Sequence, residues 1–167
     1  MRFWDSSALL PLIVEEERSR SCRDLFRADP EVFAWTFAPL EVLGGCCRKR
    51  REGTLDEAGL AAARRRLERA ARRWRRVADS PPVREAAERA LLTHDVKTAD
   101  ALQLAAALVW SEGKPRGRQF VGADDRLLAA ARRGRIHDDP TRLNMGLPSS
   151  PGGTGRRSAT SSRAHGA

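Results

Sequence analysis

Four acidic residues lie where strand patterns in the sequence give way to helix patterns: Asp5, Glu41, Asp100 and Asp124. Asp5 directly follows the apolar run 2–4, and Glu41 lies one turn into the helix expected after the second strand. Asp100 and Asp124 each begin a further helix. Parallel sheets gather residues at the carboxyl ends of their strands, and clustered carboxylates repel one another unless a cation neutralises them. The pattern therefore predicts a site for a hard divalent cation, Mg²⁺ or Mn²⁺.

We expect three of the acids, Asp5, Asp100 and Asp124, to be the metal ligands. Mg²⁺ keeps several of its waters, so two or three carboxylates suffice. Glu41 is expected to orient a water or to complete the shell of a second ion. A water acidified by the metal could then attack a phosphodiester in line, while the metal offsets the charge that develops on the phosphate oxygens.

Each acid also has an ordinary structural interpretation. Asp124 could cap a helix, Asp100 could face the helix dipole, and Glu41 could lie on the solvent side of its helix. Asp125 could replace Asp124. Asp5 fits such an interpretation least, because it would enter the edge of the core without a partner. The nearby hydroxyls of Ser6, Ser7 and Thr36 could either support the carboxylates by hydrogen bonds or cap helices.

The elements that must position these acids are short strands alternating with helices. Apolar runs predict strands at 2–5, 32–35 and 119–121, with weaker signals at 77–78 and 135–136. Amphipathic patterns, breakers and capping residues predict the intervening helices. Their expected ranges are 6–14, 17–28, 39–51, 55–77, 82–92 and a helix that begins near residue 98. Such alternation favours a parallel sheet with helices on both faces.

Two local features of these helices also carry expectations. We expect Ser6 or Ser7 to cap the first helix and Thr98 to cap the helix of Asp100. Gly44 and Gly45 lie inside one helix, where each costs about 1 kcal/mol relative to Ala. We therefore expect a close approach to another backbone there.

The composition indicates one folded domain, residues 1–140, followed by a tail, 141–167. The tail is basic and rich in Ser, Gly and Pro, which predicts disorder. We find no apolar run near the ~20 residues that span a bilayer and no secretory pattern, which favours the cytoplasm. The three cysteines, Cys22, Cys46 and Cys47, have neither a disulfide nor a zinc-binding pattern.

The net charge of +9 is concentrated in one part of the chain. Residues 48–76 hold twelve Arg or Lys against four acids, an excess of eight. Many of these side chains lie off the apolar stripe of the expected helix, and a basic ridge beside an acidic metal site fits an RNA substrate. The four residues expected to contact phosphates are Arg65, Arg69, Arg72 and Arg76. A solvated face and a docking surface for an acidic protein remain alternatives.

Taken together, these segments resemble the PIN-domain ribonucleases, and most closely the VapC toxins of bacterial toxin–antitoxin pairs. The resemblance covers about residues 1 to 140. The segments that carry it are Asp5-Ser6-Ser7-Ala8-Leu9, Thr36 with Pro39-Leu40-Glu41-Val42, Thr98 to Ala105, and Asp124 with Arg126-Leu127. Two residues depart from the family pattern: Gly122 stands where the family often has Ser or Thr, and Gln103 replaces a common His. We expect the replacement at Gln103 to matter little for the chemistry.

The resemblance implies an α/β fold, a three-layer α/β/α sandwich around a mostly parallel central sheet. It further implies a Mg²⁺-dependent endoribonuclease that leaves a 5′-phosphate and a 3′-hydroxyl. As a toxin of a type II system, the protein would form a homodimer and be neutralised by a small antitoxin protein. Two alternatives stay open: an RNA-maturation nuclease without an antitoxin, and a catalytically silent domain that binds RNA or a partner.

Overall fold

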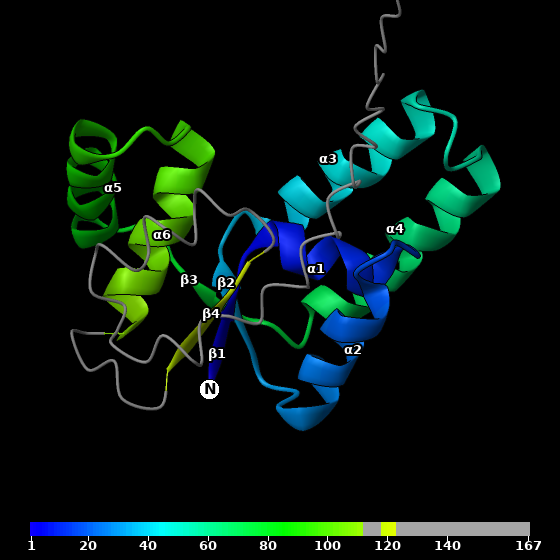
Figure 1. The fold of residues 1–167 in the computed structure, drawn as a ribbon, viewed down its shortest axis with the longest axis horizontal. Coiled ribbons are helices and arrows are strands. Elements are labelled where there is room, and N and C mark those ends of the chain that lie inside the picture. The colour runs from blue at the N-terminus through cyan, green and yellow to red at the C-terminus, as the bar shows by residue number, and fades with distance from the viewer. Residues whose placement is uncertain (112–117, 123–167) are drawn as a thin grey trace, which may run out of the picture.

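The computed structural model describes residues 1–111 and 118–122. Within these residues the fold is α/β, with four strands and six helices (Figure 1). The strands are β1 (Arg2–Trp4), β2 (Val32–Trp35), β3 (Arg75–Val77) and β4 (Gln119–Val121). The helices are α1 (Ser6–Ile13), α2 (Ser19–Ala28), α3 (Ala38–Arg51), α4 (Glu57–Ala71), α5 (Pro81–Thr93) and α6 (Thr98–Ser111).

The four strands form one sheet in the order β3-β2-β1-β4, and all the pairings are parallel. The expected α/β class with a parallel central sheet is therefore confirmed. β1 leads through α1 and α2 to β2 on one side, whereas β3 leads through α5 and α6 to β4 on the other side. The order in which strands are added to the sheet therefore reverses between β1 and β4. Open α/β sheets bind their ligands at such a switch point.

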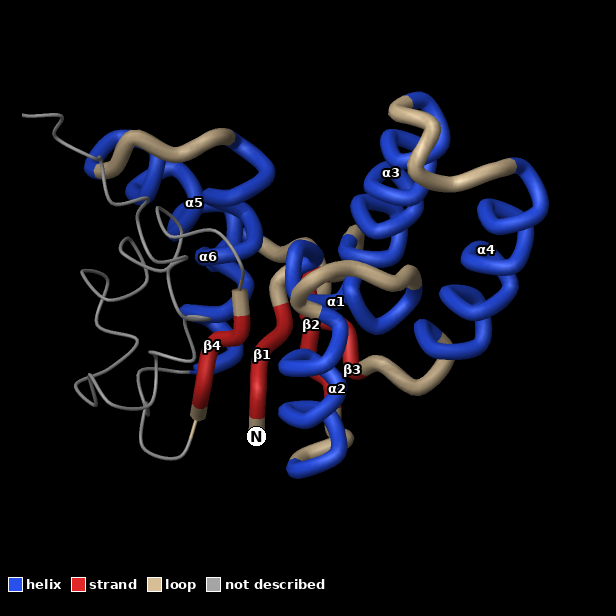
Figure 2. The backbone as a smooth tube through the Cα atoms, turned by 45° about the vertical axis from the view of Figure 1, so that its right-hand side comes forward, coloured by secondary structure: helices blue, strands red, loops and turns tan. Residues whose placement is uncertain are grey.

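Helices cover both faces of the sheet. Successive strand residues point to opposite sides of it, so each strand contacts helices on both faces. Phe3 of β1 packs with residues of α5 and α6, whereas its neighbour Trp4 packs with residues of α1 to α4. β2 alternates in the same way, with Trp35 on the α5–α6 side and Val32 on the other. Figures 1 and 2 show α5 and α6 on one side of the strands and α1 to α4 on the other. These are the three layers that the sequence predicted.

The long helix expected over 55–77 is shorter in the structure, because α4 ends at Ala71. Two tight turns close it: the N–H groups of Arg73 and Trp74 donate to the carbonyls of Ala70 and Ala71 at 3.0 and 3.3 Å. The chain then forms β3, which pairs with β2 in the register Phe33↔Arg75. Trp74 is therefore buried after the helix and not on its stripe. The helix was expected to continue through residues 75–77 because this segment is rich in arginine. An edge strand such as β3 can lack the apolar residues that mark a buried strand.

The expected close approach at the two glycines of α3 exists at one of them. A Cβ on Gly45 would lie 2.8 Å from the side chain of Leu10 in α1, whereas a Cβ on Gly44 would meet nothing within 4 Å. The neighbour of Gly45 is therefore a side chain and not the backbone that we expected. The absence of a side chain at Gly45 lets α3 pack closely against α1.

Several other expectations are settled or lie outside the described residues. The second helix starts at Ser19 instead of residue 17. Cys22, Cys46 and Cys47 are free thiols. In the part of the chain that the structure describes, no helix is long and apolar enough to cross a membrane. The expected strand at 135–136 and the tail 141–167 lie outside the described residues.

Candidate metal-binding active site

Asp5 lies at the carboxyl end of β1, where its backbone N–H donates to the carbonyl of Val121 in β4 at 2.9 Å. Its side chain is almost fully buried, with 4% exposed. It is the N-cap of α1: one carboxylate oxygen, Oδ2, accepts from the Ser7 N–H at 3.0 Å and also from the Ser7 hydroxyl. We expected Ser6 or Ser7 to cap this helix, but the cap is Asp5. Ser7 instead holds the carboxylate in place.

Glu41 lies in the first turn of α3 and is half-buried. The side-chain amide of Gln103 in α6 donates to its Oε2 at 2.5 Å. Burial raises the pKa of Glu41 from its usual 4.5 to about 7; a hydrogen bond with Ser6 opposes the shift, and the charges of Asp5 and Asp100 add to it. A carboxylate with a pKa near neutrality can exchange a proton at physiological pH.

Asp100 lies in the first turn of α6 and is half-buried. The helix begins at Thr98, and the carbonyl of Lys97 accepts the N–H of Ala101 at 2.9 Å, so Thr98 is inside the helix and not before it. Burial raises the pKa of Asp5, the hydrogen bonds from Ser7 oppose the shift, and the charge of Asp100 adds to it. The fold therefore brings three of the four predicted acids within electrostatic reach of one another.

The residue types at this centre fit a hard divalent cation. All three groups are carboxylates, the oxygen ligands that Mg²⁺ and Mn²⁺ prefer. The raised pKa values of Asp5 and Glu41 arise from burial and mutual repulsion, which a bound cation would relieve. Within residues 1–111 and 118–122, however, no three carboxylate, His or Cys side chains already form a group that could hold a metal ion. Asp124, the third expected ligand, lies outside the described residues.

Gly122 follows β4 at the switch point, directly beside Asp5. A Cβ at this position would lie 3.7 Å from the Cβ of Asp5 and 3.0 Å from the ring of Phe120. A side chain at position 122 would therefore contact that of Asp5. The departure from the family pattern therefore falls at the centre itself.

Gln103 is the residue at this centre that sequence reasoning missed. Its side chain is 1% exposed, and besides donating to Glu41 it has a buried carbonyl oxygen, Oε1, without a hydrogen-bond partner in the described part of the chain. A signal was available, because Gln103 interrupts the otherwise apolar run of residues 101–110. A buried amide in such a run needs a partner, and here the partner is Glu41.

Thr36 lies just after β2, where its backbone N–H donates to the carbonyl of Val77 at 3.0 Å. It thereby extends the pairing of β2 with β3. Among the hydrogen bonds of the described residues, none joins its hydroxyl to the three carboxylates. The expected supporting role of Thr36 stays a prediction.

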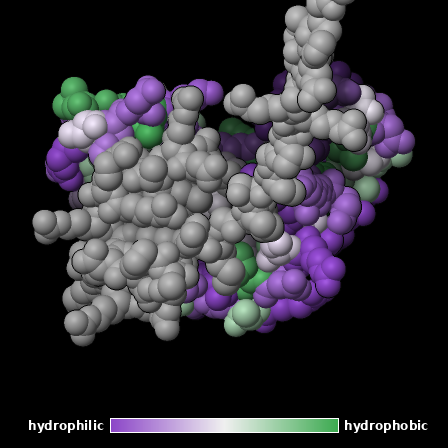
Figure 3. Space-filling model, viewed as in Figure 1, coloured by the Kyte–Doolittle hydropathy of each residue, from purple (hydrophilic) through white to green (hydrophobic). Residues whose placement is uncertain are grey.

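The four arginines expected to contact RNA come from two elements and the turn between them. Arg65 and Arg69 lie on α4, Arg72 follows its end, and Arg76 lies on β3. Arg69 and Arg72 are among the residues that line a groove beside α2, whereas Arg65 and Arg76 are not. Hydrophilic side chains cover much of the visible surface on the α3–α4 side (Figure 3).

Comparison with known families matches residues 2–132 to the PIN domain. The matched segment contains all four predicted acids. No curated protein matches the chain.

Proposed function

Because this chain belongs to the PIN domain family, whose members are generally metal-dependent nucleases, we propose that it is a Mg²⁺-dependent endoribonuclease. The observation that carries the proposal is the convergence of Asp5, Glu41 and Asp100 at the sheet's switch point. Burial and mutual repulsion raise the pKa of two of them, Asp5 and Glu41. Structural carboxylates are rarely held together in this way without a cation.

Each side chain has a distinct role in the proposed reaction. Asp5, held by Ser7, and Asp100 are the ion's ligands among the described residues, and Asp124 is the proposed third ligand. When bound, Mg²⁺ supplies a Lewis acid for the phosphate and acidifies a water. Glu41 accepts the proton of the attacking water, because a bound cation would lower its raised pKa and keep its carboxylate ionised. Gln103 fixes the direction of the Glu41 carboxylate through its amide.

The biological role that we propose is that of a toxin in a type II toxin–antitoxin pair. What supports it is the resemblance of the acid-bearing segments to the VapC toxins. In this role the protein acts in the cytoplasm on RNA, as a homodimer, and a small antitoxin protein neutralises it. An RNA-maturation nuclease without an antitoxin is the alternative that shares the same active site.

A catalytically silent RNA- or partner-binding domain is the alternative favoured by one observation. Gly122 lies beside Asp5 without the hydroxyl that the family often has there. Cleavage itself decides between this domain and the enzyme.

The test of the enzyme compares RNA cleavage in Mg²⁺, Mn²⁺ and EDTA. We expect cleavage with either metal and none in EDTA. Asp5→Asn keeps the N-cap, because Asn caps helices as well as Asp, so it removes the charge without removing the cap. We expect Asp5→Asn and Asp100→Asn to abolish cleavage, whereas Asp95→Asn, at an exposed carboxylate near Asp100, should leave it unchanged. Full activity in EDTA would contradict the mechanism.

The test of the toxin role is made in cells. Expression of the chain alone should arrest growth, and Asp5→Asn should relieve the arrest. Co-expression with a small protein encoded next to it should give a stable complex. Harmless overexpression of an active nuclease would point to RNA maturation instead.

A further inference from the structure

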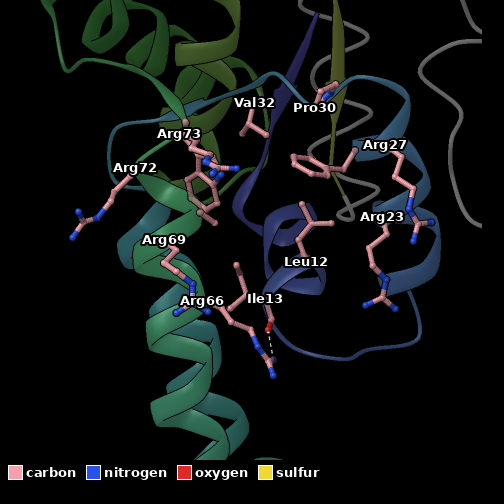
Figure 4. A pocket seen from close by; sticks show the side chains of 13 residues that line it. Leu12, Ile13, Arg23, Arg27, Pro30, Val32, Arg66, Arg69, Arg72 and Arg73 are labelled. Carbon is pink, nitrogen blue, oxygen red and sulfur yellow. Dashed lines mark hydrogen bonds between the residues drawn. The ribbon is translucent and has the colours of Figure 1, made fainter.

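A groove lies between α2 and α4 (Figure 4), and none of the three acids is among the residues that line it. Its volume is about 990 Å³. The end of α1 and the start of β2 contribute Leu12, Ile13 and Val32 to its lining. Six arginines also line it: Arg23, Arg27, Arg66, Arg69, Arg72 and Arg73. None of the described residues that line it is acidic.

The groove lies near the amino ends of β2 and β3, whereas the acids lie at the carboxyl end of the sheet. Asp5 begins α1 at the carboxyl end of β1, whereas Leu12 and Ile13 end α1, and Val32 is the first residue of β2. Eight residues of helix α1 correspond to about 12 Å. A ligand that reaches both places must therefore be extended, as a single-stranded nucleic acid is.

The α4 side of the groove carries positive charge that no carboxylate of the described residues neutralises. On the α2 side, Arg23 pairs with Glu15 at 2.8 Å and Arg27 with Asp24 at 2.7 Å. On the α4 side, Arg66 donates to the carbonyl of Ile13 at 3.2 Å, which leaves its charge unbalanced. Arg66, Arg69 and Arg73 form no ion pair with any residue that the structure describes. Their guanidinium groups face the groove, whereas that of Arg72 points away from it (Figure 4).

The apolar part of the lining is mostly buried within the protein itself. Ile13, Val32 and Trp74 belong to the core, and Phe26, 37% exposed, is the large apolar side chain that is open to solvent. A protein segment could bury the apolar lining, but it would leave the guanidinium groups of Arg66, Arg69 and Arg73 unneutralised unless it were itself acidic. Unpaired guanidinium groups around one exposed ring instead match phosphates with a base that stacks.

We propose that the groove between α2 and α4 binds a single-stranded segment of the RNA substrate outside the cleaved phosphodiester. Arg66, Arg69 and Arg73 contact successive phosphates, and Phe26 stacks on a base. The inference rests on the proposed endoribonuclease function for the identity of the ligand. It goes beyond that function by assigning a second RNA contact away from the metal.

The test measures binding of fluorescent single-stranded RNA oligonucleotides by anisotropy in EDTA, where no cleavage occurs. We expect the variant Arg66→Gln/Arg69→Gln/Arg73→Gln to flatten the log–log salt dependence of binding by about 2, since each single-strand phosphate contact contributes about 0.7. Affinity should fall for all sequences alike. Phe26→Ala should weaken binding roughly 5- to 100-fold while leaving the salt dependence unchanged.

A matched control removes three charges elsewhere. Arg20→Gln/Arg84→Gln/Arg89→Gln alters three exposed arginines outside both the groove and residues 48–76 and should leave the salt dependence near that of the unmodified protein. An unchanged slope in the groove variant, or an equal loss in the control, would overturn the proposal. So would loss of binding to an acidic amphipathic peptide with RNA binding intact, because the groove would then be a protein-docking surface.

The failure of this inference is distinguishable from failure of the proposed function. With Mg²⁺, the groove variant should raise KM for long RNA and leave kcat unchanged, whereas Asp100→Asn should remove kcat. Groove-dependent RNA binding by a protein that never cleaves RNA would refute the endoribonuclease and leave the groove as an RNA site.

Discussion

Replacing Glu41 with Gln should stabilise the metal-free protein, and the gain should grow as the pH rises. The pKa of Glu41 in the folded protein is about 7, against 4.5 in a free side chain, so folding favours its protonated form. A raised carboxyl pKa contributes stability that is fully present below about pH 4.5 and is lost as the pH rises through about 7. Gln resembles the protonated form and does not titrate.

The size of the effect follows from the pKa difference. Each unit corresponds to about 1.4 kcal/mol, which sets an upper value of about 3 kcal/mol at pH 8 for Glu41. Because Glu41 is only half-buried, solvent screening reduces this to about 1–2 kcal/mol. The new amide can also donate to the unpartnered Oε1 of Gln103. For a chain of this size, the gain corresponds to a rise in Tm of about 2–8 °C.

The assay is thermal unfolding in EDTA from pH 5 to 8.5 for the unmodified protein and for Glu41→Gln. We expect similar Tm values at pH 5 and a difference that widens towards pH 8. Mg²⁺ should raise the Tm of the unmodified protein more than that of the variant. Glu52→Gln, at an exposed carboxylate that ends the same helix, is the matched control and should show no such pH dependence. A difference that is constant with pH, or largest at pH 5, would refute the reasoning.

Three further predictions concern the same centre and its support. Mg²⁺ or Mn²⁺ should raise the Tm of the unmodified protein by mass action, and Asp5→Asn should reduce that gain in the same melting assay. An equal gain in Tm for the variant would show that Asp5 is not a metal ligand. Gly122→Ser should increase the Mg²⁺-dependent gain in Tm relative to Gly122→Ala, which makes the same contact with Phe120 but adds no hydroxyl; equal gains would show that position 122 does not contribute to the site. Gly45→Ala should lower the stability to denaturant by about 1–3 kcal/mol, because its Cβ would lie 2.8 Å from Leu10, whereas Gly44→Ala should be neutral or stabilising.

The sequence predicted the buried parts of the fold well, because buried elements have strong patterns. β1, β2 and β4 are short apolar runs, and each of the described acids follows such a run or begins the next helix. Three of the carboxylates at these junctions lie near one another in the described residues, and that they bind a metal stays a prediction. The parallel sheet followed from the alternation of strands and helices.

The remaining features depend on contacts between distant residues, which a local pattern does not contain. β3 is arginine-rich, so its sequence indicated only a weak strand at 77–78, and its pairing with β2 shows that it spans Arg75–Val77. The contact of Gln103 with Glu41 joins residues 62 positions apart. The capping of α1 by Asp5 instead of a serine depends on the exact backbone geometry at the end of β1.

The pairing of β1 with β4 also has a consequence for synthesis of the protein. β1 is made first, yet its partner on one side is β4, and Arg2 Nε donates to the side chain of Gln119 at 2.8 Å. Such long-range pairing forms late and slows folding. A nascent chain can therefore assemble the layer of α1 to α4 on the ribosome while the edge beside Asp5 is still open. The proposed metal centre can form only after β4 has been synthesised, so a chain interrupted before residue 119 would lack the strand that closes the sheet beside Asp5.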